Sequence, residues 1–310
     1  MKRILGITLA AMMSLSLLAG CGGSDEPSSS TAPAAPASSA APASSEAPKG
    51  MEGPITVVSR EPGSGTRGAF IELMGIEEKG ADGTKTDHTT QDAVIASQTN
   101  VVMTNVAGDP NAIGYISLGS LNDTVKAVNV DGVEANAENV KAGTYKVARP
   151  FNIATKGEPT GLAKDFIDFI MSKEGQQIVV DAGYIAVADD AAAYAGDKPQ
   201  GRLVIAGSSS VSPVMEKLAE AYKAVNAGAE IELQTSDSTA GMTAAIDGTC
   251  DIGMASRGLK DTESAELVGL AIANDGIAVV VSPENPVENL TSEQIKGIFT
   301  GEIIDWADAQ

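Results

Sequence analysis

The stretch that decides the fold runs from residue 55 to residue 70 and reads Ile55-Thr56-Val57-Val58-Ser59-Arg60-Glu61-Pro62-Gly63-Ser64-Gly65-Thr66-Arg67-Gly68-Ala69-Phe70. Its β-branched start predicts a buried strand, and the Pro-Gly-Ser-Gly segment predicts a turn. An apolar helical period begins at Phe70, so we expect a strand, a turn and a helix. Backbone N–H groups at a helix start lack intrahelical partners and lie at the positive end of the dipole, so this turn can bind an anion.

Three interpretations of this turn compete. In the first, Ser64 only caps the helix, as most serines at such positions do. In the second, the glycines at 63, 65 and 68 form the G-x-G-x-x-G dinucleotide fingerprint, but Glu61-Pro62 lengthens the turn and a clean βαβ partner is missing. A nucleotide-hydrolysing phosphate loop is excluded because Ala69-Phe70 stands where Lys-Ser/Thr is required.

The third interpretation is a small oxyanion site. Ser64 and Thr66 offer hydroxyl donors, and Gly65 lets an anion approach the backbone closely. Arg60 adds a fixed charge that can donate two hydrogen bonds to one oxyanion. The weight of this interpretation depends on whether other turns of the chain carry similar donors.

Composition restricts the class of protein. The chain has 310 residues, enough for about two domains, and a formal net charge of −20. This negative charge argues against a nucleic-acid partner, which requires basic patches, and any bound anion must be held by local donors. Aromatic residues make up only 4% while Ala, Gly, Val and Ile abound, as is typical of α/β layers.

Cysteine and histidine are scarce. The two cysteines, Cys21 and Cys250, provide no disulfide framework, and Cys250 is expected to be a small buried apolar residue. The single histidine, His88, excludes a His-rich metal site and a Ser-His-Asp triad. We therefore expect no metal, no cofactor and no catalytic residues.

The N-terminal 51 residues predict export and tethering. Residues 1–21 combine Lys2-Arg3, an apolar run and Leu-Ala-Gly-Cys, which resembles the bacterial lipoprotein signal with Cys21 as the lipidated residue. Residues 22–51 are mostly Ser, Ala, Pro, Gly and Glu, so we expect a disordered tether. The protein is then lipid-anchored at the cell membrane, facing the extracellular or periplasmic side.

Two later strand-to-helix turns also carry hydroxyl groups. Gly207-Ser208-Ser209-Ser210 follows a predicted strand at 203–206, and Thr235-Ser236-Asp237-Ser238-Thr239 follows one at 230–234. Three such turns favour the oxyanion interpretation, because α/β folds bind ligands at the carboxyl ends of their strands. No base accompanies these serines, so they are expected to bind a ligand and not to act as nucleophiles.

The remaining expectations concern single elements. Residues 92–96 suggest a short helix, and residues 101–103 look like a strand because of their two valines. An amphipathic helix is expected from Gly161 through residue 179, with its apolar side in the core. Residues 188–201 predict a loop or linker.

Several segments together carry a family resemblance. The chain resembles the phosphate-binding proteins of the Pst-type phosphate ABC transporter in segments 59–67, 112–115, 149–151, 207–213, 251–257, 275–281 and 290–306. The resemblance covers nearly everything from Ile55 to Trp306. It implies an α/β fold with two periplasmic-binding-protein-like lobes (type II) that close over a dehydrated phosphate ion, a permease and an ATPase subunit as membrane partners, and a monomer.

The order of these segments differs from the family. There the Gly-Ser-Ser turn comes first, whereas here the loop at 59–67 opens the folded part. A circular permutation explains this order, with the usual ends joined through residues 188–201. It predicts one lobe at 52–148 plus 281–310 and a continuous second lobe at 149–280.

The resemblance also assigns phosphate-binding residues. Ser209, Ser210 and Ser238 are expected to donate from the continuous lobe, and Arg60, Ser64, Gly65 and Thr66 from the other. In some family members an aspartate accepts the proton of hydrogen phosphate and thereby excludes sulfate. This chain has Arg257 at that place, which leaves open whether Asp237 or Glu61 accepts the proton or selectivity is looser.

The expected function is the capture of inorganic phosphate between two lobes and its delivery to an ABC transporter permease, without enzymatic activity. One alternative is a binding protein for another tetrahedral oxyanion such as sulfate. A second is an exported phosphate sensor or adhesin with no role in transport. A hydrolase of phosphoesters is disfavoured, because it requires a metal cluster or an activated nucleophile.

Overall fold

The computed structural model describes residues 51–81 and 83–309. The predicted signal segment, Cys21 as the predicted lipidation site, and most of the predicted tether therefore lie outside the described residues. The strands are β1 (Thr56–Arg60), β2 (Glu77–Lys79), β3 (Lys85–Asp87), β4 (Val94–Ala96), β5 (Ala112–Ser117), β6 (Lys126–Ala127), β7 (Asn129–Val130), β8 (Ala148–Thr155), β9 (Gly201–Ser208), β10 (Ala229–Ser236), β11 (Ile252–Ala255), β12 (Val268–Val281) and β13 (Asn289–Leu290).

Helices alternate with these strands, as α/β layers require. They are α1 (Gly65–Leu73), α2 (Thr99–Ala107), α3 (Ala137–Lys141), α4 (Gly161–Ile170), α5 (Lys173–Asp181), α6 (Ser212–Val225), α7 (Ser238–Asp247), α8 (Asp261–Ser264) and α9 (Ser292–Thr300), with short 3-10 turns at Leu118–Ser120 and Trp306–Ala309. In the described part of the chain, no helix is both long enough and apolar enough to cross a membrane.

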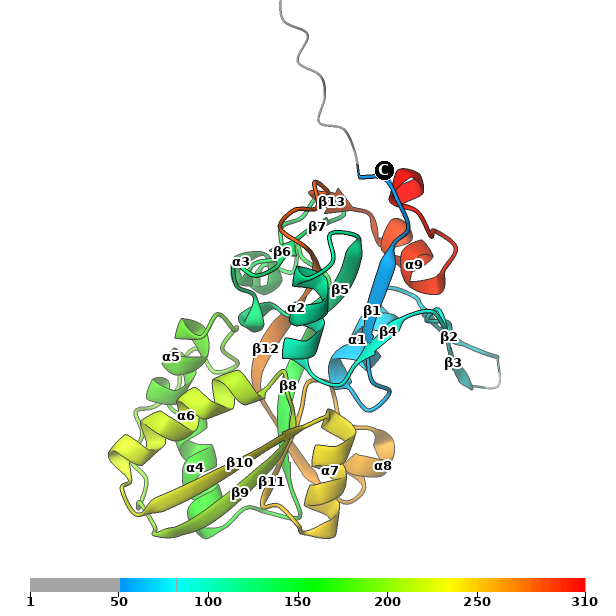
Figure 1. The fold of residues 1–310 in the computed structure, drawn as a ribbon. Coiled ribbons are helices and arrows are strands. Elements are labelled where there is room, and N and C mark those ends of the chain that lie inside the picture. The colour runs from blue at the N-terminus through cyan, green and yellow to red at the C-terminus, as the bar shows by residue number, and fades with distance from the viewer. Residues whose placement is uncertain (1–50, 82, 310) are drawn as a thin grey trace, which may run out of the picture. The chain divides into compact units, whose positions relative to one another are not determined.

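One continuous sheet runs through the structure in the order β10-β9-β11-β8-β12-β5-β1-β4 (Figure 1). At one end β9 lies parallel to β10 and β11, and at the other β1 lies parallel to β4 and β5. Between these groups, β12 is antiparallel to β8 over residues 268–276 and antiparallel to β5 over residues 277–281. The long strand β12 therefore joins the two parallel groups.

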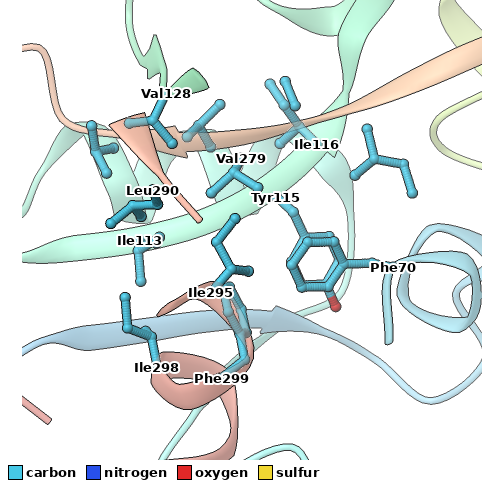
Figure 2. Close-up of a cluster of buried hydrophobic side chains, with 14 of the residues drawn as sticks. Phe70, Ile113, Tyr115, Ile116, Val128, Val279, Leu290, Ile295, Ile298 and Phe299 are labelled. Carbon is cyan, nitrogen blue, oxygen red and sulfur yellow. The ribbon is translucent and has the colours of Figure 1, made fainter. Parts of the chain in front are cut away.

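Apolar side chains form two main cores. Figure 2 shows part of the first, in which Phe70 stacks on Tyr115 with ring centroids 4.0 Å apart, and Phe299 meets Phe70 edge-on. The second core is centred on Phe166 and Tyr222. Strand β12 contributes to both, because Ala273 belongs to the second core and residues 277–281 belong to the first.

Two expected elements are wrong in type. Residues 94–96 form β4, because this segment pairs in parallel with β1 (Val58 opposite Val94) and does not form a helix. Residues 101–103 lie inside α2, not in a strand. This helix buries Thr99, Val102 and Val106, which lie three and four residues apart on one face. The β propensity of valine is overridden here by burial of that face.

The expected helix from 161 to 179 is interrupted. It consists of α4 and α5, separated at Met171-Ser172, where the Ser172 hydroxyl accepts a hydrogen bond from Gly175 N and caps α5. The predicted loop at 188–201 is confirmed as far as residue 200, since residues 188–200 form no helix or strand and Gly201 begins β9. Within it, the Tyr194 hydroxyl donates to the buried Asp165 carboxylate.

Candidate anion-binding site

Five loops that follow strands of the central sheet carry the candidate site. They follow β1 and β4 in one parallel group and β9, β10 and β11 in the other. Strands that run parallel have their carboxyl ends at the same edge of the sheet, so the loops within each group lie together. Hydrogen bonds between the groups join the segments after β1 and β4 to those after β9, β10 and β11.

The loop after β1 has the predicted helix-start geometry. Ser64 is buried and is the N-cap of α1, with its hydroxyl oxygen accepting from Arg67 N at 3.3 Å. Gly65 is the first helical residue, and a Cβ atom there would lie 2.5 Å from Ser238 Oγ and 2.9 Å from Ser256 Oγ. Only glycine therefore allows this loop to approach the serines of the other parallel group so closely.

Seven side chains form what we call the hydroxyl cluster. They share burial of more than nine-tenths of their surface and lie at the carboxyl ends of the five strands or in the turns and helix starts that follow: Thr66, Thr99, Ser208, Ser209, Ser210, Ser238 and Ser256. Thr66 Oγ1 lies 2.8 Å from Ser210 Oγ and 3.3 Å from Ser256 Oγ. Thr99 Oγ1 lies 3.2 Å from Ser210 Oγ. Ser238 Oγ accepts from Ser256 N at 3.1 Å.

The Arg60 guanidinium lies at the border of the hydroxyl cluster and is 2% exposed. Its Nε and Nη2 atoms donate to the two carboxylate oxygens of Glu61 at 2.8 and 2.7 Å. Nη2 also donates to Ser209 Oγ at 3.2 Å, and Nη1 donates to Thr99 Oγ1 at 3.4 Å. A buried, forked guanidinium of this kind is suited to bind an oxyanion.

Three residues concern the acceptance of the proton of hydrogen phosphate: Glu61, Asp237 and Arg257. Each has a hydrogen-bond partner in the structure. Both Glu61 oxygens accept from Arg60, and Asp237 caps α7 by accepting from Ala240 N at 2.8 Å. Arg257 donates to both oxygens of Glu263, at 2.7 and 2.8 Å. Burial acts to raise the pKa of Glu263, but hydrogen bonds from Arg257 and from Lys260 N hold that pKa below its ordinary value.

Six of the seven predicted binding residues lie together in the structure. The structure brings Arg60, Gly65, Thr66, Ser209, Ser210 and Ser238 together, and it places Ser64 beside them as a helix cap. Reasoning from the sequence missed Thr99, because residues 101–103 were assigned to a strand and the helix start at Thr99 was hidden. Reasoning from the sequence also missed Ser256 as a ligand candidate. The available signal was its position directly after the apolar strand β11.

The arrangement can bind an anion, since the hydroxyl groups, the Arg60 guanidinium and the start of α1 all present donors. Among the described residues, no carboxylate or imidazole accepts a hydrogen bond from the hydroxyl cluster, so none is positioned to activate a serine. No group of three or more His, Cys, Asp or Glu side chains within 51–81 and 83–309 is arranged to hold a metal ion. A groove of about 720 Å³ lies alongside and is lined in part by Ser64, Thr239 and Arg257.

Comparisons with known proteins define the class. The family model described as a PBP superfamily domain matches residues 38–174 and 192–310. A curated phosphate-binding protein, PstS 2 of Streptococcus agalactiae, is 49% identical over 97% of this chain and 96% of its own length. The crystal structure of a phosphate-binding protein of a phosphate ABC transporter from Streptococcus pneumoniae has a TM-score of 0.67 and 45% identity, and the match covers 83% of this chain and all of that one.

The class is therefore the PBP superfamily, and the expected α/β fold with two periplasmic-binding-protein-like lobes is confirmed. Within that superfamily, the chain belongs to the family that includes the curated PstS proteins.

Proposed function

We propose that this protein binds inorganic phosphate at the hydroxyl cluster and Arg60. The observation that carries the proposal is that hydroxyl groups from both parallel groups of strands surround one place beside a buried guanidinium. Directed donors in a buried site can replace the hydration shell of an anion, whereas each bond left unmade costs about 1–3 kcal/mol. The relatives named as phosphate-binding proteins support phosphate as the anion.

The binding residues in this proposal are Arg60, Ser64, Gly65, Thr66, Ser209, Ser210 and Ser238, and the structure adds Thr99 and Ser256 as candidates. Because the chain has a net charge of −20, these local donors must overcome a repulsive overall field.

We propose further that the protein is the substrate-binding component of a phosphate importer and is not an enzyme. It delivers phosphate to the permease and ATPase subunits of an ABC transporter. Lipid on Cys21 and the tether at 22–51 hold it at the outer side of the cell membrane as a monomer.

The lobes are proposed as 52–148 with 281–310 and 149–280, with closure by bending of the crossing strands. The position at which β12 passes from one core to the other, between Ala273 and Ile277, lies close to this division. A circular permutation remains our explanation of the segment order. The gap between the two matched stretches of the family model, at 175–191, overlaps the start of the proposed join at 188–201.

Isothermal titration calorimetry of residues 51–310 with phosphate, and then with phosphate in excess sulfate, tests the proposal. Strong phosphate binding that sulfate does not displace is the expected result. Displacement by sulfate would favour the alternative of a less selective oxyanion-binding protein, and binding of neither ion would refute the proposed function. Phosphate uptake by cells that lack the gene separates an importer from a sensor or adhesin.

A further inference from the structure

A second buried guanidinium, that of Arg149, reaches the hydroxyl cluster from the start of β8. This side chain is 5% exposed. Its Nη2 atom donates to Thr66 Oγ1 at 2.9 Å, and its Nε atom donates to the Ser256 carbonyl oxygen at 3.1 Å. Arg149 thus contacts a residue of the loop after β1 and a residue of the loop after β11.

The same guanidinium is held by the neighbouring strand. Asp275 is the cross-strand partner of Arg149 in β12, and Arg149 Nη1 donates to Asp275 Oδ2 at 2.5 Å and to the Gly276 carbonyl oxygen at 3.0 Å. Asp275 is fully buried, and its Oδ1 atom accepts from Gly119 N at 3.3 Å. A buried ion pair is a weak source of stability compared with apolar packing, so its location beside the candidate site calls for another explanation.

The hydrogen-bond chemistry of Thr66 explains why the ion pair of Arg149 and Asp275 lies beside the candidate site. A threonine hydroxyl has a single proton to donate, and its oxygen accepts from other groups. Because Arg149 Nη2 is always a donor, Thr66 Oγ1 is the acceptor in that bond, and its own proton points to another acceptor. That acceptor is a neighbouring hydroxyl oxygen or an anion bound in the cluster.

Two other hydroxyl oxygens of the cluster also accept hydrogen bonds from N–H groups that can only donate. Ser209 Oγ accepts from Thr99 N at 3.3 Å, and Ser238 Oγ accepts from Ser256 N at 3.1 Å. The Arg149 side chain donates to the Thr66 hydroxyl oxygen just as backbone amides donate to the hydroxyl oxygens of these two serines.

We infer that Arg149 is a positioning residue for anion binding, which fixes the Thr66 hydroxyl as a donor and is itself aligned by Asp275. The inference rests on the proposed function in that the anion is phosphate. Arg149 acts through Thr66 and not by direct contact with the anion.

A double-mutant cycle measured by calorimetry on the full chain tests this role. The paired variant Arg149→Gln/Asp275→Asn removes both charges, so that neither is left buried alone, and Thr66→Val removes the hydroxyl at nearly constant volume. In the Thr66 background we expect the paired variant to weaken phosphate binding about tenfold, the effect of one charge-assisted hydrogen bond. In the Thr66→Val background we expect a further loss of less than about twofold, because coupled residues are not additive.

The outcomes separate the possible roles. A tenfold loss in both backgrounds means that Arg149 acts independently of Thr66 and overturns the inference, as does unchanged affinity in the Thr66 background. The matched control is Arg202→Gln/Glu232→Gln, an exposed ion pair between β9 and β10, which should leave affinity unchanged. If the paired variant does not fold, Arg149→Lys keeps a charge opposite Asp275 and loses the fork, and it should weaken phosphate binding in the Thr66 background but not further in the Thr66→Val background.

A readout without ligand separates this inference from the proposed function. In threonine-methyl NMR of the ligand-free chain, Arg149→Lys should shift the Thr66 methyl resonance and leave Thr239, which Arg149 does not contact, in place. An unshifted Thr66 resonance overturns the inference. Should the unmodified chain bind neither phosphate nor sulfate, the proposed function fails and the methyl spectrum alone decides whether Arg149 holds Thr66.

Discussion

The two sides of the hydroxyl cluster differ in charge. The charged side, which we define as Arg60, Thr66 and Thr99, comes from the end of β1 and the starts of α1 and α2, and it contains a guanidinium. The neutral side, Ser208, Ser209, Ser210, Ser238 and Ser256, comes from the loops after β9, β10 and β11 and presents hydroxyls and amides. Arg257 lies next to the neutral side, and its Nη1 and Nη2 atoms donate to Glu263 as Arg60 donates to Glu61. Unlike Arg60, which also donates to Ser209 and Thr99, Arg257 donates to no hydroxyl of the cluster.

This difference indicates a division of roles. The charged side supplies the strong, charge-assisted bonds, whereas the neutral side completes the enclosure with weaker neutral donors. Loss of the charge should therefore cost more affinity than loss of any single hydroxyl.

Replacement of Arg60 should have the largest effect. Arg60→Ala removes charge-assisted hydrogen bonds of about 1.5–3 kcal/mol each and leaves Glu61 unpaired beside an anion, so phosphate affinity should fall by at least about 100-fold. Calorimetry measures the change, with Arg202→Ala, at an exposed position near the start of β9, as the control. Affinity within threefold of the unmodified chain would show that the charged side is wrongly assigned.

Gly65→Ala tests whether the two sides must meet. The added methyl group would lie 2.5 Å from Ser238 Oγ, and overpacking of this kind costs about 1–3 kcal/mol. Phosphate affinity should fall accordingly. Gly68→Ala in the same helix is the matched control, because its Cβ would meet no atom within 4 Å. Equal affinities of the two variants would mean that the closed contact between Gly65 and Ser238 is not needed for binding.

Removal of one hydroxyl from the neutral side should have a smaller effect. Ser210→Ala should weaken phosphate binding by about 1 kcal/mol, or about fivefold, the contribution of a neutral hydrogen bond. Ser212→Ala, at the start of α6, is the control, since the Ser212 hydroxyl donates to the backbone oxygen of Ser208 and lies 2.9 Å from Thr235 Oγ1, and it contacts no hydroxyl of the cluster. A loss as large as that of Arg60→Ala would erase the distinction between the sides.

Ser64→Ala tests whether Ser64 contacts the anion or only stabilises the start of α1. Since its hydroxyl caps α1, the substitution should lower the free energy of unfolding by about 1 kcal/mol. Thermal unfolding measures this, and Thr291→Ala at the start of α9 provides a comparable cap for reference. A large loss of phosphate affinity at unchanged Tm would show that Ser64 contacts the anion as proposed, whereas unchanged affinity would remove Ser64 from the proposed binding residues.

The smallest expected effect concerns pH. The pKa of Glu263 in the folded protein lies below its ordinary value of 4.5, so the unfolded chain binds the proton more readily. The stabilisation from Glu263 is therefore complete above pH 4.5 and is lost as the pH falls through the lowered folded value. In Glu263→Gln this part of the acid dependence of Tm should vanish. An identical acid profile for both proteins would show that Arg257 is not neutralised by Glu263.

Much of the site could be predicted because its signals are local. Arg60, Gly65 and Thr66 occur in one contiguous turn, and the turns with Ser209 and Ser238 follow recognisable apolar strands. Thr99 was missed because two valines after it favour a strand, and the burial that makes the segment helical comes from distant residues. Arg149 was not recognised as part of the site, because its partners Thr66 and Asp275 are 83 and 126 residues away.

By itself, the sequence determined the alternation of strands, turns and helices, the hydroxyl-bearing turns and the negative charge that any anion site must overcome, since each follows from periodicity, turn chemistry and composition. Only the tertiary structure decided which turns meet and which hydroxyls are held as donors. Thr66 and Ser256 are 190 residues apart and come within 3.3 Å only through the order and register of the strands between them. Strand order depends on the packing of whole layers, so no local sequence pattern predicts it.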